Sequence, residues 1–306
     1  MIFLMGATAC GKTELSLLLA RELNAEIISV DSALVYRGLN IGTAKPNLAE
    51  REAIPHHLID ICDPWQSYSA ALFCDDAHRL ISEIQARGRK ALLVGGTMLY
   101  FRSLQQGLAS LPDADHSIRQ DLQKAAVVAG WDSLHRQLAQ VDPMAARRIH
   151  PNDPQRIMRA LEVFRITGKP LSELQSSTRG RLSVPPVKFA LMPDERSWLH
   201  QRIERRFRLM LHNGFLTELQ GLYDHPLITS DQPAMRSVGY RQAWEHIESG
   251  SEGDQWVEKA IAATRQLAKR QLTWLRGMAD LHTIACDRLT PEQQLSDILC
   301  NLSSHP

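Results

Sequence analysis

Short apolar runs alternate with amphipathic stretches over the first hundred residues of the chain. Four runs have the length and composition of buried strands: residues 2–5, 26–30, 58–61 and 90–94. Residues 13–23 and 70–87 carry apolar side chains at helical spacing, and Ser69 is a suitable N-cap for the second of these helices. This alternation predicts a largely parallel sheet with helices on both faces.

The pattern changes after Pro112. Strand-like runs stop, and helices are predicted over residues 115–129, from Trp131, over 143–150 and over 154–167. Sheet-like sequence returns at residues 187–191. We therefore expect a core of residues 1–112 and 187–306, interrupted by an all-helical insertion domain of residues 113–186.

A glycine-rich loop separates the first strand from the first helix. Its residues fit the pattern G-x-x-x-x-G-K-[ST]: Gly6, Ala7, Thr8, Ala9, Cys10, Gly11, Lys12 and Thr13. A strand, a glycine loop and a helix N-terminus form a cradle whose backbone N–H groups point at a phosphate. In such a cradle Lys12 contacts phosphate oxygens and the Thr13 hydroxyl binds Mg²⁺. The predicted fold class is therefore α/β, with a sheet like that of the P-loop NTPases.

Two further polar residues follow strands of the predicted sheet. Asp31 comes directly after residues 26–30, and Thr97 comes after Gly95-Gly96 at the end of residues 90–94. Ligands of parallel sheets bind beyond the carboxyl ends of the strands, so both residues and the glycine loop should share one rim. Asp31 would there suit a general base or a metal ligand, although an Asp at a strand end is also a common cap or turn former.

Two motifs of nucleotide hydrolases are missing. The strand at residues 91–94 ends in glycine, where a Walker-B strand supplies an Asp for Mg²⁺. The guanine-reading pattern N-K-x-D does not occur either. We therefore do not expect an ATPase or GTPase cycle.

The composition, 44% hydrophobic and 23% charged residues with a net charge of +1, is that of an ordinary globular protein. The five cysteines are scattered, odd in number and without C-x-x-C spacing, which indicates a reducing compartment and argues against a disulfide framework or a zinc site. The apolar start is too short to span a membrane and no cleavable signal precedes it. We expect a cytoplasmic protein.

Two helices expected in the second half of the core are basic. One has its buried face at Leu199, Ile203, Phe207 and Met210, and it carries Arg202 and Arg206 as i, i+4 neighbours. The other covers residues 260–276 and holds Arg265, Lys269, Arg270 and Arg276 without an acidic residue. Such helices are more often solvated surfaces than binding elements.

The insertion adds a third basic segment. Arg147, Arg148, Arg156 and Arg159 surround a proline-punctuated turn at residues 150–154. Three basic segments around one phosphate site favour a polyanionic substrate over three solvated surfaces.

Together these features resemble the bacterial tRNA dimethylallyltransferase family, also called tRNA isopentenyltransferases. The resembling segments are residues 31–34 (DSAL), 36–46 (YRGLNIGTAKP), 94–97 (VGGT), 150–156 (HPNDPQR), 236–241 (RSVGYR) and 269–276 (KRQLTWLR). With the glycine loop they extend in order from Gly6 to Arg276. The chain departs from the family at Ala7, where members usually carry Pro, and at Cys10, where they carry a smaller residue. Neither change removes a phosphate donor.

The resemblance implies a prenyl transfer. Members of the family hold the diphosphate of dimethylallyl diphosphate in the loop and move the five-carbon group to N6 of adenosine 37, beside the anticodon. The products are N6-dimethylallyladenosine (i6A) and diphosphate. The resemblance places Asp31 as proton acceptor, and it implies Lys12, Thr13 with Mg²⁺, Thr97 and Arg206 as the groups that neutralise the leaving diphosphate. Arg202 and Arg205 are alternatives to Arg206.

The resemblance also implies contacts with the anticodon stem-loop of tRNA. The residues concerned are Asp31, Ser32, Ala33, Leu34, Thr97, Arg119, Gln155, Arg156, Ile157, Met158, Arg159, Arg236, Ser237, Val238, Gly239, Tyr240, Arg241, Lys269, Arg270, Gln271, Leu272, Thr273, Trp274, Leu275 and Arg276. The expected partners are thus tRNA and dimethylallyl diphosphate, with no membrane and no obligate protein partner.

Three other functions remain open at this point. A nucleotide kinase would use the same loop for ATP, and an adenylate isopentenyltransferase would prenylate free AMP-type nucleotides. A non-catalytic RNA-binding protein would keep the loop without using it. The insertion and the basic segments argue against the first two, and Lys12, Thr13 and Asp31 argue against the third.

Overall fold

A parallel sheet of six strands organises the larger part of the fold, in the order β3-β2-β4-β1-β7-β8. The strands are β1 (Ile2–Gly6), β2 (Ala25–Val30), β3 (His56–His57), β4 (Lys90–Gly95), β7 (Val187–Met192) and β8 (His282–Ala285). All of β1 is buried, as expected of a strand with helices on both faces. The prediction of a parallel α/β sheet is confirmed.

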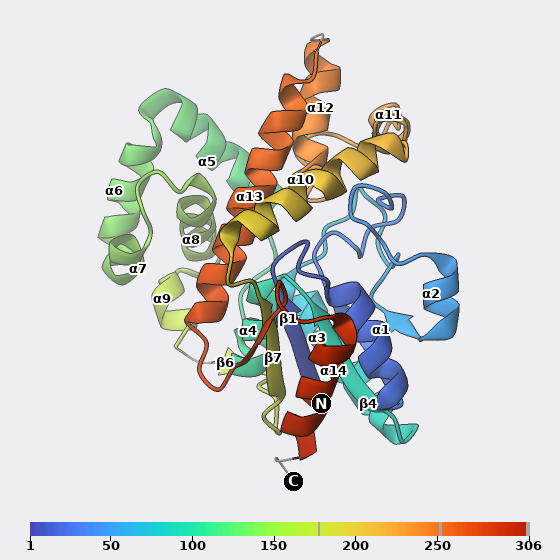
Figure 1. Cartoon of the computed structure of the whole chain (residues 1–306). Helices are drawn as coiled ribbons and strands as arrows, with labels where there is room; N and C mark the ends of the chain where they lie inside the picture. The colour runs from blue at the N-terminus through green and yellow to red at the C-terminus, as the bar shows by residue number, and fades with distance from the viewer. Residues whose placement is uncertain (177, 251–252, 304–306) are drawn as a thin grey trace. The chain divides into compact units, whose positions relative to one another are not determined.

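Helices α1 (Lys12–Glu22), α3 (Ala70–Ala86), α13 (Gln255–Arg276) and α14 (Pro291–Ser303) contact strands of this sheet. Outside residues 107–183 the chain also forms α2 (Leu48–Ala53), α4 (Met98–Gln106), α10 (Arg196–His212), α11 (Phe215–Tyr223) and α12 (Tyr240–Ser249). On β2, Glu26 pairs with Arg87 at the end of α3, whereas Ser29 lines a cavity together with Lys12 of α1. Because side chains alternate along a strand, α3 and α1 lie on opposite faces. Helix α14 packs beside α1 (Figure 1).

The computed structural model describes residues 1–176, 178–250 and 253–303 and divides the chain into two units. The larger unit is Met1–Arg102 with Val184–Pro306, and the smaller is Ser103–Ser183. The smaller unit begins before the predicted residue 113 because it includes β5 (Leu108–Ala109), which pairs antiparallel with β6 (Thr178–Arg179). The domain ranges expected from the sequence also contain residues 177, 251–252 and 304–306, which lie outside the described residues.

The smaller unit is built mainly of helices around its own core. They are α5 (His116–Ala129), α6 (Trp131–Val141), α7 (Pro143–Arg148), α8 (Pro154–Thr167) and α9 (Leu171–Leu174). Four of them match predicted helices, and Leu122, Leu134, Leu138, Ile157 and Val163 are among the residues of the buried core. The expectation of an all-helical insertion is wrong in one respect, since the β5–β6 pair belongs to this unit.

The third strand of the sheet is displaced from the predicted residues 58–61. Pairing with β2 is made by His56–His57 instead. Leu58 and Asp60 have φ values of 62° and 57°, which end the extended backbone there. The Asp60 carboxylate accepts a hydrogen bond from Arg51 at 2.7 Å. This local turn was not visible in the apolar pattern.

Helices of the larger unit agree with their periodicity. Ser69 caps α3 by accepting a hydrogen bond from the N–H of Leu72, as predicted. On α10 the predicted face of Leu199, Ile203, Phe207 and Met210 is buried. Helix α13 is longer than residues 260–276 and begins at Gln255. Within the described parts of the chain, no helix has both the length and the apolar content needed to cross a membrane.

Candidate active site

The glycine loop joins the end of β1 to the first turn of α1. Ala9 and Gly11 have φ values of 65° and 91°, so the chain reverses sharply before the helix. The Lys12 ammonium donates hydrogen bonds to the carbonyl oxygens of Gly6 and Ala7, at 2.9 and 2.7 Å. Burial lowers the pKa of Lys12 below its ordinary value, because the ammonium loses hydration. An anion in the loop would add opposite charge beside this ammonium.

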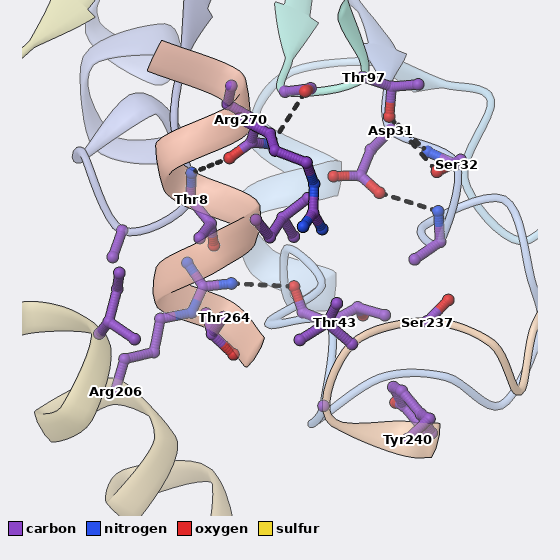
Figure 2. A pocket seen from close by; sticks show the side chains of 18 of the residues that line it. Thr8, Asp31, Ser32, Thr43, Thr97, Arg206, Ser237, Tyr240, Thr264 and Arg270 are labelled. Carbon is purple, nitrogen blue, oxygen red and sulfur yellow. Dashed lines mark hydrogen bonds between the residues drawn. The ribbon is translucent and has the colours of Figure 1, made fainter. Parts of the chain in front are cut away.

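The turns after β2 and β4 meet beside this loop. The backbone N–H of Ser32 donates to the Thr97 hydroxyl oxygen at 3.0 Å. The Asp31 carboxylate accepts a hydrogen bond from the N–H of Ala33 at 2.8 Å, which orients it. Figure 2 shows Asp31 and Thr97 at the edge of one pocket, with Asp31 pointing inward. The structure thus brings Asp31 and Thr97 to the rim that holds the glycine loop.

Two cavities share a wall made by this rim. The phosphate-loop cavity measures about 450 Å³ and is lined by Lys12 and Thr13 among others. The α13 cavity measures about 460 Å³ and is lined by Arg236, Arg270 and Trp274 among others. The residues that line both are Thr8, Ala9, Asp31, Thr43, Gly96, Arg206 and Gln271. A carboxylate and a guanidinium therefore lie between a loop suited to anions and a second cavity that is basic and partly aromatic.

Three arginines of α10 line the phosphate-loop cavity: Arg202, Arg205 and Arg206. Arg202 Nε donates to the carbonyl oxygen of Ala9 in the loop at 2.9 Å, and Arg206 Nη2 donates to that of Thr43 at 3.1 Å. Desolvation lowers the pKa of the partly buried Arg206 guanidinium. A desolvated cation attracts an anion more strongly than a hydrated one, which favours Arg206 for a diphosphate contact.

Gly95 accounts for the missing Walker-B carboxylate. Strands β2 and β4 pair in register at Val30 and Gly95. A Cβ atom built on Gly95 would lie 2.0 Å from the carbonyl oxygen of Val30, closer than any real contact. No side chain fits there without moving β2, so this strand end cannot offer the Asp of a nucleotide hydrolase.

Oxygen atoms suited to Mg²⁺ line the phosphate-loop cavity. Besides the Thr13 side chain there is the Ser29 hydroxyl, which is buried and has no hydrogen-bond partner among the described residues. Mg²⁺ prefers oxygen ligands and usually takes few from protein when phosphates are present. In the described residues no group of three His, Cys, Asp or Glu side chains is placed to hold a metal. The residues present therefore fit a magnesium ion that a bound diphosphate helps to hold.

Two residues that line these cavities were not predicted as site residues from the sequence motifs. Thr43 lines both cavities and holds Arg206, and it belongs to the segment 36–46, whose resemblance to the family assigned it no role. Ser29 lies two positions before Asp31, so the alternation of side chains along a strand could have placed both on one face.

Only some of the α13 residues predicted to contact RNA are exposed. Leu272 and Leu275 are buried, at 8% and 0% exposure, so their side chains belong to the core. The exposed members of the segment are Lys269, Arg270, Thr273, Trp274 and Arg276. In the segment 236–241, Gly239 and Tyr240 are buried, whereas Arg236 and Arg241 are exposed.

In the smaller unit, two of the predicted RNA contacts are held by a buried carboxylate. Glu162 is fully buried and accepts hydrogen bonds from Arg119 at 2.7 and 3.1 Å and from Arg159 at 2.7 Å. Burial by itself would raise the pKa of Glu162, but these hydrogen bonds bring it below the ordinary value. Ile157 is buried in the core of the unit, whereas Gln155 and Arg156 are exposed. The arginine pairs favour a structural role for Arg119 and Arg159.

Comparison with known proteins places these features in one family. The profile of the IPP transferase family matches residues 34–278. A tRNA dimethylallyltransferase of Nitrosococcus oceani is 56% identical over 276 residues, which are 90% of this chain and 88% of that protein.

Solved structures agree with this assignment. The tRNA isopentenylpyrophosphate transferase of Bacillus halodurans is 36% identical with a TM-score of 0.71, covering 99% of this chain and 95% of its own. A eukaryotic dimethylallyltransferase acting on tRNA is 27% identical with a TM-score of 0.80, covering 100% of this chain and 80% of its own. With the glycine loop and Asp31 in place, the chain belongs to the tRNA dimethylallyltransferases, the IPP transferase family.

Proposed function

We propose that this enzyme transfers the dimethylallyl group of dimethylallyl diphosphate to N6 of adenosine 37 in tRNA, giving i6A and diphosphate. The observation that carries the proposal is the position of Asp31 in the wall shared by the two cavities. A carboxylate placed there can take a proton from a nucleophile in one cavity while an anion leaves in the other. The names of the relatives support tRNA as the acceptor.

The phosphate-loop cavity is the donor site in this proposal. Lys12, Arg206 and the N–H groups of the loop bind the diphosphate, with Arg202 and Arg205 nearby. Thr13 would hold Mg²⁺, and the buried Ser29 hydroxyl lines the same cavity. When bound, the ion neutralises charge on the diphosphate oxygens.

The reaction then needs one proton acceptor and several fixed cations. The N6 atom attacks the first carbon of the prenyl group, a new N–C bond forms, and the C–O bond to diphosphate breaks. Asp31 takes the proton that N6 loses, because an exocyclic amine whose lone pair is delocalised into the ring is a poor nucleophile. Lys12, Thr97 and Arg206 stabilise the charge that develops on the leaving diphosphate.

The α13 cavity is the proposed entrance for the adenine. Bases of a single-stranded loop can be turned out of their stack for a few kcal/mol and stacked on aromatic or guanidinium planes. Trp274 is 38% exposed, and the Arg102 guanidinium lies 5.6 Å from its ring centroid. Arg236 and Arg270 line the same cavity and would contact phosphates of the anticodon stem-loop.

A direct assay separates this function from its rivals. The protein is incubated with labelled dimethylallyl diphosphate, Mg²⁺ and either AMP or unmodified tRNA. We expect label in tRNA alone. Label in AMP would instead indicate an adenylate isopentenyltransferase, and phosphoryl transfer from ATP to a free nucleotide would indicate a kinase. We place the reaction in the cytoplasm, because the scattered cysteines suit a reducing compartment.

A further inference from the structure

Gln271 joins segments that lie far apart in the sequence. Its Oε1 accepts a hydrogen bond from the N–H of Thr8 at 2.9 Å, and its Nε2 donates to the carbonyl oxygen of Gly96 at 2.9 Å. A Cβ on Gly96 would lie 2.5 Å from this Nε2, so the amide lies directly against the turn after β4. A primary amide accepts from an N–H and donates to a C=O at the same time, which neither a carboxylate nor a thioether can do.

The two turns that Gln271 holds carry the groups of the proposed chemistry. Thr8 lies in the loop that cradles the diphosphate, and Figure 2 marks its hydrogen bond to Gln271 with a dashed line. Gly96 precedes Thr97, whose hydroxyl accepts the hydrogen bond from Ser32 next to Asp31. A displacement of Gln271 would therefore shift the diphosphate loop and the turn of the proton acceptor together.

The helix that carries Gln271 also presents the exposed basic residues. Arg270 and Trp274 line the α13 cavity beside Gln271, and Lys269 is exposed. The resemblance assigns Gln271 itself to RNA contact, but both ends of its amide already bind protein backbone. RNA bound to α13 would thus act on the loop through this side chain.

We infer that Gln271 is a positioning residue that makes the binding of RNA and of diphosphate interdependent. The inference rests on the proposed function, because it takes RNA as the ligand of α13 and diphosphate as the ligand of the loop. When bound RNA immobilises α13, the Gln271 hydrogen bonds also immobilise the loop in the form that binds diphosphate. Diphosphate then loses less conformational entropy in ordering the loop, so it binds more tightly. By thermodynamic linkage, diphosphate must strengthen RNA binding by the same factor.

The test measures binding of inorganic diphosphate by calorimetry in excess Mg²⁺, with the free protein and with protein saturated by an unmodified anticodon stem-loop. For the native protein we expect RNA to lower the diphosphate dissociation constant by about 5- to 150-fold, the usual range of such coupling. Gln271→Met has a similar length without the amide. In this variant the ratio of the diphosphate dissociation constants without and with RNA should be within about twofold of one. Gln271→Glu keeps the acceptor for Thr8 and loses the donor for Gly96, so it should also reduce the ratio.

Gln266→Met is the matched control, since Gln266 is an exposed residue of the same helix. It should keep the native ratio. The inference is overturned if Gln271→Met keeps that ratio, or if the two ligands bind the native protein independently. Should Gln271→Met not fold, Gln271→Glu decides by the same criterion. Independent binding with intact prenyl transfer contradicts only the coupling, whereas absence of transfer to tRNA contradicts the proposed function.

Discussion

The backbone N–H of Ser32 donates a hydrogen bond to the hydroxyl of Thr97 at 3.0 Å, which ties the turn after β2 to the turn after β4. Asp31 immediately precedes Ser32, so this bond holds the proposed proton acceptor at the edge of both cavities. The carboxylate is oriented further by the N–H of Ala33. Position and orientation of a general base are what its efficiency requires.

Asp31→Asn should therefore slow prenyl transfer by roughly 10²- to 10⁴-fold, the range for losing a general base, while diphosphate and tRNA still bind. Single-turnover transfer of labelled donor to tRNA measures the effect. Asp75→Asn, on an exposed position of α3, should transfer at the native rate. Near-native transfer by Asp31→Asn would remove this carboxylate from the mechanism.

Diphosphate binding should weaken as the pH rises. Burial lowers the pKa of Lys12, and a bound polyanion favours the charged ammonium, so affinity falls when the pH passes through that lowered value. Lys12→Met should bind diphosphate about 10- to 100-fold more weakly, as expected for a hydrogen bond to a charged group. It should also lose this part of the pH dependence. Calorimetric titrations at a series of pH values below the ordinary lysine pKa test both expectations, with the exposed Lys90→Met as control.

The basic residues on α13 should matter for RNA alone. Lys269→Ala and Arg270→Ala should each weaken tRNA binding and flatten its logarithmic salt dependence by about 0.7 to 0.9 per lost phosphate contact. Diphosphate binding should stay unchanged. Filter binding over a range of salt concentrations gives the slopes, and Lys259→Ala on the same helix is the control. An unchanged slope in both variants would mean that these side chains are only solvated.

Gly95→Ala should disrupt the rim. The new methyl group would lie 2.0 Å from the Val30 carbonyl oxygen, so β2 or β4 must move. Overpacking of this kind usually costs about 1–3 kcal/mol of unfolding free energy. Urea unfolding measures the loss, and Gly277→Ala, whose Cβ would meet its nearest atom at 3.6 Å, should change stability much less. Equal stability of the two variants would contradict the close pairing of β2 and β4.

Glu162→Gln should destabilise the smaller unit. Breaking a buried ion pair costs about 3–5 kcal/mol, but Arg119 and Arg159 are 43% and 30% exposed, so we expect on the order of 2 kcal/mol. The pKa of Glu162 is lower in the folded state than in the unfolded state. Its contribution is therefore present above the unfolded pKa and is lost as the pH falls through the folded one.

Urea unfolding at neutral and acidic pH tests this expectation. The difference between the native protein and Glu162→Gln should shrink in acid. Glu173→Gln alters an exposed pair with Lys169 in the same unit and should have little effect at either pH. A difference that stays constant down to acidic pH would assign the loss to packing instead of charge.

Part of this architecture follows from local pattern. Short stretches of sequence were enough to predict the glycine loop, the strands β1, β2 and β4 and the buried face of α10. Asp31 could be placed beside the loop because parallel strands of one sheet end at a common edge. These features depend on the spacing of residues within one element, or on topology that such spacing implies.

Contacts between distant segments were decided only by the tertiary structure. Gln271 lies in a segment that was predicted to contact RNA from its resemblance to the family. Its amide instead accepts a hydrogen bond from the N–H of Thr8, 263 positions away. Leu272 and Leu275 share that segment but are buried in the core. Strand β3 lies at His56–His57, directly N-terminal to the apolar run that was predicted to form it. Hydrogen-bond partners are chosen by which backbone groups packing brings within about 3 Å, and no periodicity of one element encodes that.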